Sequence, residues 1–264
     1  MGIAFFDSGI GGITVLHEAM KRLPGESFLY FADTLHVPYG TKTSEEVNKY
    51  VKQSIDQITR EDVKAIVIAC NTATSIAISG LRNGYDIPII GMEPAVKPAV
   101  EMNRSTGKRV LVFATELTLK QSKYTDLVSR VDEQCIVDSL PLPELVEYCE
   151  ALNFDIRVIN DYFRAKLAPF NMSTYGTIVL GCTHYPFYKN ILRKLFPDIQ
   201  IVDGSAGTVR RLSQVLKSAD IVNVQAPVKA QTQVSAQLSM DVKFMCSGNE
   251  PAYIRKMERA LEII

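Results

Sequence analysis

The chain has 264 residues, of which 47% are hydrophobic and 22% charged, and this balance excludes wholesale disorder. Its 29 basic and 29 acidic residues cancel, and with no basic cluster the sequence predicts no binding to nucleic acid or to a membrane surface. No apolar stretch reaches the roughly 18–20 residues of a membrane span, and the amino terminus lacks the basic segment of a signal peptide. The sequence therefore predicts a cytoplasmic protein of one large or two modest domains.

Short apolar runs alternate with helical patterns through the first half of the chain. Apolar residues at a helical spacing predict a helix over 14–23, which Pro24 and Gly25 end. Ser44 is the predicted N-cap of a helix of about 15 residues. Strands are predicted at 3–6, 28–32, 64–69 and 87–91, and a further helix ends at about residue 82.

The same layout begins again at Arg109, where an apolar run is followed by a polar turn and a helix. Residues 135–150 are interpreted as a strand followed by a loop, and the alternation at 228–239 predicts an edge strand or a hairpin. The other predicted elements are a helix near 153–168, a strand at 177–181, a helix over 205–218, a strand from 242 and a closing helix from Pro251.

Two similar segments, KAIVIACNTAT at 64–74 and TIVLGCTHYP at 177–186, each carry a cysteine after a short apolar run. An apolar run without alternation is typical of a strand buried in a parallel sheet, and ligands bind at the carboxyl ends of such strands. Cys70 and Cys182 lie 112 positions apart, and Asp7 and Thr115 lie 108 apart. The sequence therefore predicts two related α/β domains, each a doubly wound parallel sheet, with chance similarity of βα units as the alternative.

A thiol between a strand and a helix amino terminus lies near backbone N–H groups that lower its pKa. Cys135, Cys149 and Cys246 lack polar neighbours in sequence and are interpreted as ordinary apolar cysteines. The five cysteines are odd in number and widely spaced, which predicts free thiols, and no ligand spacing predicts a metal site. Two thiols that face one cleft suit removal of a proton from carbon and its return to the opposite face. A Cys–His pair at 182 and 184 would suit acyl transfer, but it leaves Cys70 unexplained.

Other polar positions carry a functional and a structural interpretation. Ser8 and the glycines after Asp7 offer donors to a carboxylate ligand, although Asp7 would equally cap a turn. The glycine run does not match a dinucleotide-binding motif, and no lysine has the surroundings of a pyridoxal phosphate site, so no cofactor is predicted. Thr115 and Thr118 are interpreted either as ligand contacts or as helix caps, and Asp33 and His36 as a polar loop.

The motifs FDSGIGG, ADTLHVPYG, ACNTAT and GCTHYP, in this order, closely resemble those of the cofactor-independent bacterial glutamate racemases. The resemblance covers nearly the whole chain. It implies two pseudo-symmetric α/β domains with the active site in the cleft between them, and an enzyme that supplies D-glutamate for peptidoglycan. We place the first domain at 1–94 and 207–264 and the second at 95–206. A homodimer is a further implication of the resemblance.

The resemblance also assigns roles to individual residues. It implies that Cys70 acts on D-glutamate and Cys182 on L-glutamate, each reprotonating the product of the other, and that Asp7 and His184 assist the thiols. Asp33 and Glu147 match acidic residues with supporting roles. The positions that match substrate contacts are Asp7, Ser8, Pro38, Tyr39, Gly40, Asn71, Thr72, Thr115, Thr118, Thr183 and His184.

Three features depart from the family pattern. Ala114 stands where the family usually has glycine, GMEP at 91–94 replaces VIEP, and LPLPELVE matches only loosely around Glu147. The chain also begins almost at its first strand, from which we expect no regulation by a peptidoglycan-precursor activator that binds an amino-terminal extension.

Three alternative functions remain at this stage. A racemase of aspartate would need a cleft shorter by one methylene, a difference worth only ~1–3 kcal/mol. A Cys–His hydrolase or transferase would use Cys182 alone. A catalytically silent binding protein would need neither thiol.

Overall fold

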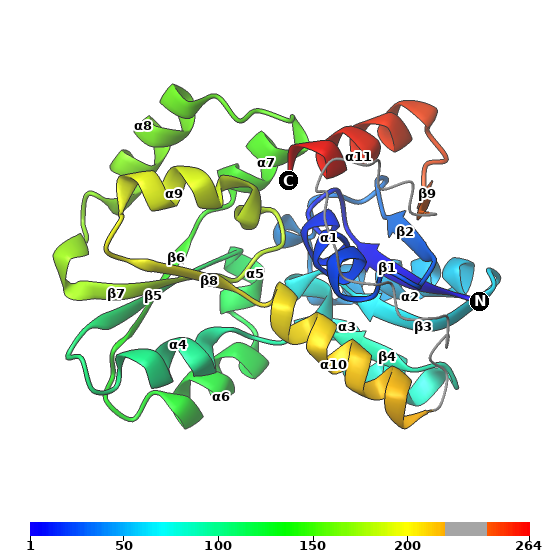
Figure 1. Ribbon diagram of the computed structural model, residues 1–264, viewed down its shortest axis with the longest axis horizontal. Helices are drawn as coiled ribbons and strands as arrows, with labels where there is room; N and C mark the ends of the chain where they lie inside the picture. The colour runs from blue at the N-terminus through cyan, green and yellow to red at the C-terminus, as the bar shows by residue number, and fades with distance from the viewer. Residues whose placement is uncertain (220–241) are drawn as a thin grey trace, which may run out of the picture.

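The computed structural model describes residues 1–219 and 242–264, whose strands form two parallel sheets lying side by side (Figure 1). The first sheet has the order β4-β3-β1-β2-β9 and the second the order β6-β5-β7-β8. The first comprises β1 (Gly2–Asp7), β2 (Phe28–Ala32), β3 (Val63–Ile68), β4 (Ile89–Gly91) and β9 (Val242–Cys246). The second comprises β5 (Arg109–Ala114), β6 (Val137–Pro141), β7 (Tyr175–Leu180) and β8 (Gln200–Asp203).

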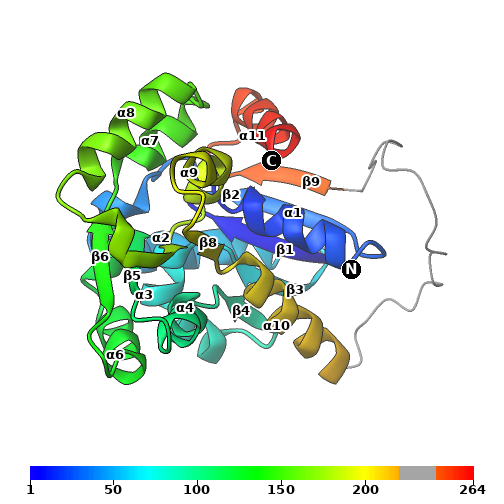
Figure 2. The ribbon, with the colours of Figure 1, turned by 60° about the vertical axis from the view of Figure 1, so that its left-hand side comes forward.

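Helices connect these strands and cover both faces of each sheet. They are α1 (Ile13–Arg22), α2 (Ser44–Ile58), α3 (Asn71–Gly84), α4 (Val96–Asn103), α5 (Glu116–Leu119), α6 (Ser122–Val131), α7 (Glu144–Glu150), α8 (Ile156–Leu167), α9 (Lys189–Leu195), α10 (Ser205–Ser218) and α11 (Pro251–Ile263). Figure 2 shows α1 and α10 side by side, and the two helices pack closely. No helix within residues 1–219 and 242–264 combines the length and the hydropathy of a membrane span.

The two sheets repeat one arrangement. In the first, β1 lies between β2 and β3, and in the second, β5 lies between β6 and β7. The outer strand β4 pairs with β3 as β8 pairs with β7. All of these pairs are parallel, so the predicted pair of doubly wound α/β units is confirmed, and β3 and β7 occupy equivalent positions.

Burial on both faces explains the unbroken apolar runs. Ile3 and Phe5 of β1 belong to a core that includes residues of α1 and α10, whereas Ala4 and Phe6 point into a core with α2 and α3. Alternate residues of a strand point to opposite faces, so each must be apolar when helices cover both. The first of these cores continues into the second sheet through Phe113 and its neighbours.

The chain passes twice between the sheets. Strands of the first sheet come from residues 2–91 and 242–246, and those of the second from 109–203. The predicted domain boundaries, 1–94 with 207–264 and 95–206, fall within the two connecting stretches and stay a prediction.

Two local predictions are wrong. The N-cap of α2 is Thr43, not Ser44: the Thr43 hydroxyl accepts from the Glu46 backbone N–H at 3.2 Å, and Glu46 accepts from the Thr43 N–H at 2.8 Å. The expected loop at the end of 135–150 is the helix α7, whose Leu145, Val146 and Cys149 are buried. The strand or hairpin predicted at 228–239 lies outside the described residues.

Candidate active site

The two thiols end equivalent strands and lie almost wholly inside the protein. Cys70 follows β3 and is the N-cap of α3, and its Sγ accepts from the Ala73 backbone N–H at 3.4 Å. Cys182 follows β7, and its Sγ lies 3.7 Å from Nδ1 of His184. The side chains are only 5% and 7% exposed. In each sheet the strand order reverses at one point, between β1 and β3 in the first and between β5 and β7 in the second. Each thiol lies beside this topological switch point, which is where such sheets bind ligands.

Burial dominates the electrostatics of Cys70. Desolvation raises the pKa of the Cys70 thiol well above its usual value, Asp7 raises it further, and the Ala73 N–H and Ser8 lower it only in part. The expected lowering by the helix amino terminus is therefore outweighed by burial and by the negative charge of Asp7. A thiolate at Cys70 needs a neighbour that takes the proton.

Asp7 joins the two halves beside Cys70. At the end of β1, its Oδ1 accepts from the Gly9 N–H at 2.8 Å, while its Oδ2 accepts from the Thr183 hydroxyl at 2.9 Å. The carboxyl group is fully buried, and this burial raises the pKa of Asp7 to about 6, against an opposing effect of His184. Ser8 is buried next to it, with its hydroxyl 3.5 Å from Oδ1.

His184 forms a second buried group with Glu150. Its Nε2 donates to Oε1 of Glu150 at 2.8 Å, and its Nδ1 faces Cys182. Desolvation alone would lower the pKa of His184, but Cys182 and Glu150 outweigh it and raise this pKa well above its usual value. Desolvation likewise opposes ionisation of Glu150, yet His184 and Lys256 lower its pKa to about 2. Both shifts favour the charged forms, an imidazolium beside a carboxylate.

Glu150, and not the predicted Glu147, is the acidic residue that reaches the site. Glu147 is exposed on α7, whereas Glu150 hydrogen-bonds both His184 and the backbone N–H of Ile10, at 2.9 Å. A helical interpretation of 144–150 with Cys149 buried would have placed Glu150, the next residue, beside the core. Interpreting this segment as a loop removed that signal.

The glycines after Asp7 serve contacts between the halves. A Cβ at Gly11 would lie 2.5 Å from Nδ1 of His184, and a Cβ at Gly9 would collide with the Glu150 carboxylate. The glycine run therefore lets the first half approach His184 and Glu150 of the second.

Three threonine hydroxyls meet at the first turn of α3, the helix that Cys70 caps. Thr72, in the first turn of α3, lies 3.1 Å from Thr115 and 3.0 Å from Thr118, and the last two are 2.9 Å apart. Thr115 also caps α5 by accepting from the Thr118 N–H. Gly40 packs against Thr115, since a Cβ there would lie 3.1 Å from the threonine Cβ. Both interpretations of Thr115, as helix cap and as site residue, fit this arrangement.

Asp33 organises the segment that carries Pro38 and Tyr39. Its buried carboxylate accepts from the Tyr39 hydroxyl at 2.6 Å, from Ser247 at 2.7 Å and from His36 at 2.9 Å. Tyr39 is itself buried, and Pro38 precedes it after a cis peptide bond. The polar loop expected at Asp33 is thus an internal support, held partly by Ser247, which sequence reasoning missed.

Asn71 lies at the edge of the site. It is half-buried in the first turn of α3 and, with Thr118, lines a cavity of about 220 Å³ that extends toward the chain crossing at Met92–Ala95. All the predicted site residues except Glu147 therefore lie around the thiols or on the loops next to them.

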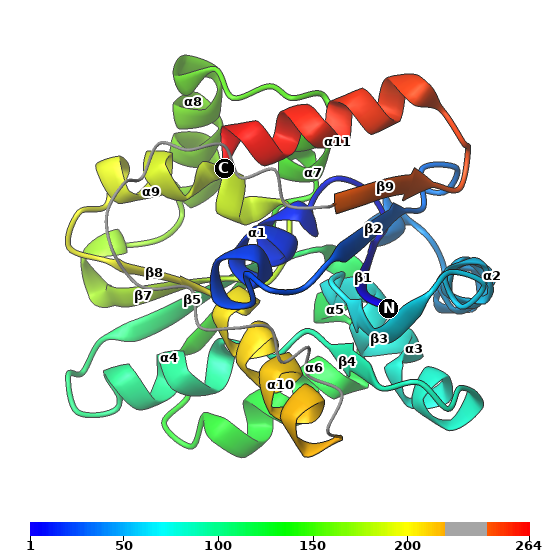
Figure 3. The ribbon, with the colours of Figure 1, turned by 45° about the vertical axis from the view of Figure 1, so that its right-hand side comes forward.

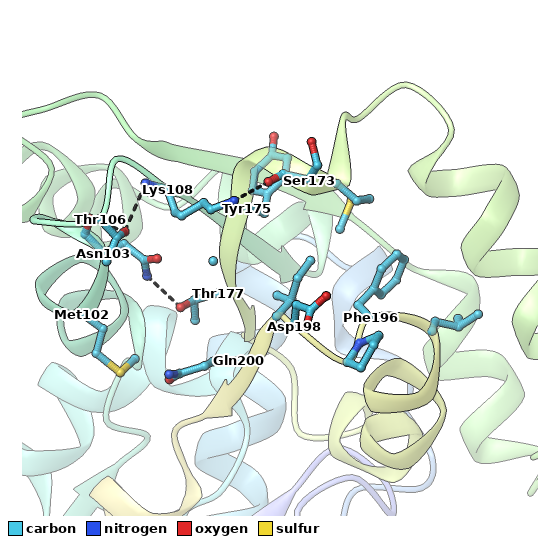
Figure 4. A pocket seen from close by; sticks show the side chains of 15 residues that line it. Met102, Asn103, Thr106, Lys108, Ser173, Tyr175, Thr177, Phe196, Asp198 and Gln200 are labelled. Carbon is cyan, nitrogen blue, oxygen red and sulfur yellow. Dashed lines mark hydrogen bonds between the residues drawn. The ribbon is translucent and has the colours of Figure 1, made fainter.

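A separate cavity of about 560 Å³ lies at the amino-terminal ends of β5, β7 and β8 (Figure 4). Lys108 there donates to the Ser173 carbonyl at 2.6 Å, and the Asn103 side-chain amide donates to Thr177 at 2.7 Å. This is the end of the sheet opposite to the one that binds ligands, and it contains no predicted site residue.

Comparisons with known proteins agree with this geometry. Residues 14–243 match the family model described as Asp/Glu/Hydantoin racemase. The glutamate racemase of Halothermothrix orenii is 48% identical over 265 residues, covering 100% of this chain and 99% of the relative. Glutamate racemase 2 of Bacillus subtilis is 51% identical over 217 residues, 82% of each chain. The structure of the Francisella tularensis glutamate racemase in complex with D-glutamate superposes with a TM-score of 0.79 at 27% identity, covering 99% and 93% of the two chains.

Proposed function

The chain belongs to the aspartate/glutamate/hydantoin racemase family, and we propose that it interconverts L- and D-glutamate by proton transfer between Cα and two thiols. One observation carries this proposal: Cys70 and Cys182 end equivalent strands, are both buried, and each has a separate acid–base partner. The names of the relatives favour glutamate over aspartate as substrate.

The proton balance of the reaction is simple. The Cys70 thiolate removes the α-proton of D-glutamate, and the Cys182 thiol donates its proton to the opposite face of Cα. The enzyme is left with a thiol at Cys70 and a thiolate at Cys182, which is the state that accepts L-glutamate. No electron leaves the system, so this step needs no redox partner.

Burial disfavours the thiolate form of each cysteine, and the neighbouring acid–base groups make that form accessible. Asp7, with a pKa of about 6, is largely ionised at pH 7 and receives the proton of Cys70. The His184 imidazolium stabilises the thiolate of Cys182 by donating from Nδ1. Positioning and exclusion of water then account for much of the rate, since the α-proton is weakly acidic.

Hydroxyl and amide groups around the thiols would hold the two carboxylates of the substrate. We assign this role to the side chains or backbone N–H groups of Ser8, Tyr39, Gly40, Asn71, Thr72, Thr115, Thr118 and Thr183. Pro38 has no N–H, and we assign it to shaping the loop that carries Tyr39 and Gly40. The assignment is supported by their placement around Cys70 and Cys182.

The second candidate, a Cys–His hydrolase or transferase, is favoured only by the contact between Cys182 and His184. It does not use Cys70 or the equivalence of the two strands. We also propose that the enzyme acts in the cytoplasm as a homodimer, supplies D-glutamate for peptidoglycan and has the domain boundaries given above.

The test is to follow optical rotation of D-glutamate and of L-glutamate with purified protein, in H₂O and in D₂O. Loss of rotation from both enantiomers, with deuterium entering Cα, is the expected result. Cys70→Ser and Cys182→Ser should each abolish it. Racemisation of aspartate but not of glutamate would change the assigned substrate to aspartate and leave the mechanism unchanged. Activity that survives in Cys70→Ser would favour the Cys–His alternative.

A further inference from the structure

The last helix of the chain reaches the catalytic centre through Glu150. This helix, α11, follows β9 of the first sheet, and Figures 1 and 3 show it beside α7, the helix that ends at Glu150. Lys256 donates to Oε2 of Glu150 at 2.6 Å, and the Tyr253 hydroxyl donates to the same oxygen at 2.6 Å. The residues that meet here are more than 100 positions apart in sequence.

The two carboxylate oxygens of Glu150 accept hydrogen bonds from different groups. Oε1 accepts from Nε2 of His184 and from the Ile10 N–H, and Oε2 accepts from Tyr253 and Lys256. With four donors in place, rotation of the carboxylate would break several hydrogen bonds at once. The orientation of His184 toward Cys182 therefore depends on groups that do not touch His184.

Buried residues anchor both helices next to this contact. Met257 and Ala260 of α11 are fully buried, and Cys149 next to Glu150 is fully buried as well. Tyr253 and Lys256 are three residues apart, so they share one face of α11, and the Lys256 ammonium lies 4.2 Å from the centre of the Tyr253 ring. The Lys256 side chain is 22% exposed, yet the side chain of its ion-pair partner, Glu150, is largely buried.

We propose that Tyr253 and Lys256 are positioning residues that hold Glu150, and through it His184, in the orientation that serves Cys182. The proposal rests on the proposed racemase function, which it extends to the closing helix. Both side chains hydrogen-bond Glu150, and within residues 1–219 and 242–264 neither hydrogen-bonds a thiol, so their effect on catalysis passes through the Glu150–His184 pair.

The first experiment measures steady-state racemisation by the full-length chain and four variants. Lys256→Met should lower kcat about 10–100-fold and change KM for glutamate by less than about threefold, because Lys256 acts on the reacting groups only through others. Lys256→Arg should restore most of the rate, and Tyr253→Phe, which removes one hydroxyl, should cause a smaller loss. Lys243→Met is the matched control, since it removes a lysine from the exposed ion pair with Glu61 and should leave kcat unchanged.

A double-mutant cycle tests the route of the effect. If Lys256 acts through Glu150, Glu150→Gln combined with Lys256→Met should be no slower than Glu150→Gln alone, within about twofold. Losses that multiply, or a Lys256→Met variant as active as Lys243→Met, would overturn the proposal.

A readout without substrate separates this proposal from the proposed function. The chain has three histidines, and the Nε2–H of His184 donates to a buried carboxylate, so its proton should exchange slowly with water in NMR spectra. This resonance should persist in Lys243→Met and Lys256→Arg and exchange about tenfold faster in Lys256→Met. If this resonance exchanges at the same rate in Lys256→Met as in the wild type, the positioning role is overturned, whatever the activity of the wild type toward glutamate. If the exchange rate changes as expected but the wild type does not racemise glutamate, the proposed function is overturned and the positioning role stands.

Discussion

Cys70 and Cys182 end equivalent strands of two sheets that share a four-strand arrangement, yet the groups that support them differ. Cys70 has a buried carboxyl group, Asp7, nearby, while Cys182 faces an imidazolium that a carboxylate holds in place. Burial raises the pKa of Asp7 to about 6, whereas, despite desolvation, His184 and Lys256 lower that of Glu150 to about 2. Repetition of a fold thus sets where the thiols lie, and side chains that differ between the two halves set their acid–base chemistry.

The largest expected effect comes from removing one thiol at a time. Cys182→Ala and Cys70→Ala should each lower racemisation at least about 10³-fold, because one face of Cα loses its proton donor. In D₂O, Cys182→Ala should still exchange the α-proton of D-glutamate through Cys70, and Cys70→Ala that of L-glutamate. Proton NMR of each enantiomer measures this exchange. Exchange of both enantiomers by one variant would show that the two thiols are not assigned to separate faces.

The next effect concerns the pH dependence on the Cys70 side. Because Asp7 must be ionised to accept a proton, kcat/KM should rise with pH through about 6. Asp7→Asn should lower kcat/KM about 100-fold and remove this rise. A pH profile in buffers of constant ionic strength provides the measurement, and a rise near pH 6 that persists in the variant would assign it to another group.

Stability should depend on pH in opposite senses for the two carboxylates. The folded pKa of Glu150 lies below its usual 4.5, so its stabilising contribution is present above pH 4.5 and is lost as pH falls toward 2. That of Asp7 lies above its usual 3.8, so its contribution is greatest below pH 3.8 and falls as pH rises through 6. Glu150→Gln should therefore cost about 3 kcal/mol at pH 7 and much less near pH 2.

Denaturant unfolding of wild type, Glu150→Gln and Asp7→Asn at several pH values measures both trends. Relative to Asp7→Asn, the wild type should lose stability between pH 4 and pH 7. If the free energy of unfolding of the two variants, relative to the wild type, changed with pH in the same sense, the opposite pKa shifts of these carboxylates would be contradicted.

The smallest expected effect distinguishes the two glutamates of α7. Glu147 is exposed, so Glu147→Gln should change the free energy of unfolding by no more than about 0.5 kcal/mol and kcat by less than about twofold. The same assays used for Glu150→Gln provide the comparison. A large loss of activity in Glu147→Gln would restore the role that sequence resemblance gave to this residue.

Much of the fold and of the site could be predicted from the sequence. Strands buried on both faces must be continuous apolar runs, so β1, β3, β5 and β7 are visible as local patterns, and the polar residues after them mark the carboxyl edge of each sheet. Asp7, Cys70 and Cys182 directly follow the predicted apolar runs, and His184 lies two residues beyond Cys182. The roles of Asp7 and His184 come from the family resemblance.

Only the tertiary structure decided which groups tune those residues. Glu150 meets Tyr253 and Lys256 because α7 packs beside α11, and no local pattern encodes a contact across more than 100 positions. Because the segment of α7 is interpreted from sequence as a loop, its pattern is not used to distinguish Glu150 from Glu147. The sequence by itself thus determined where the thiols stand, because strand ends are local features. Packing of distant helices determined the charge and orientation of their partners, because electrostatics in a buried site depends on every group that surrounds it.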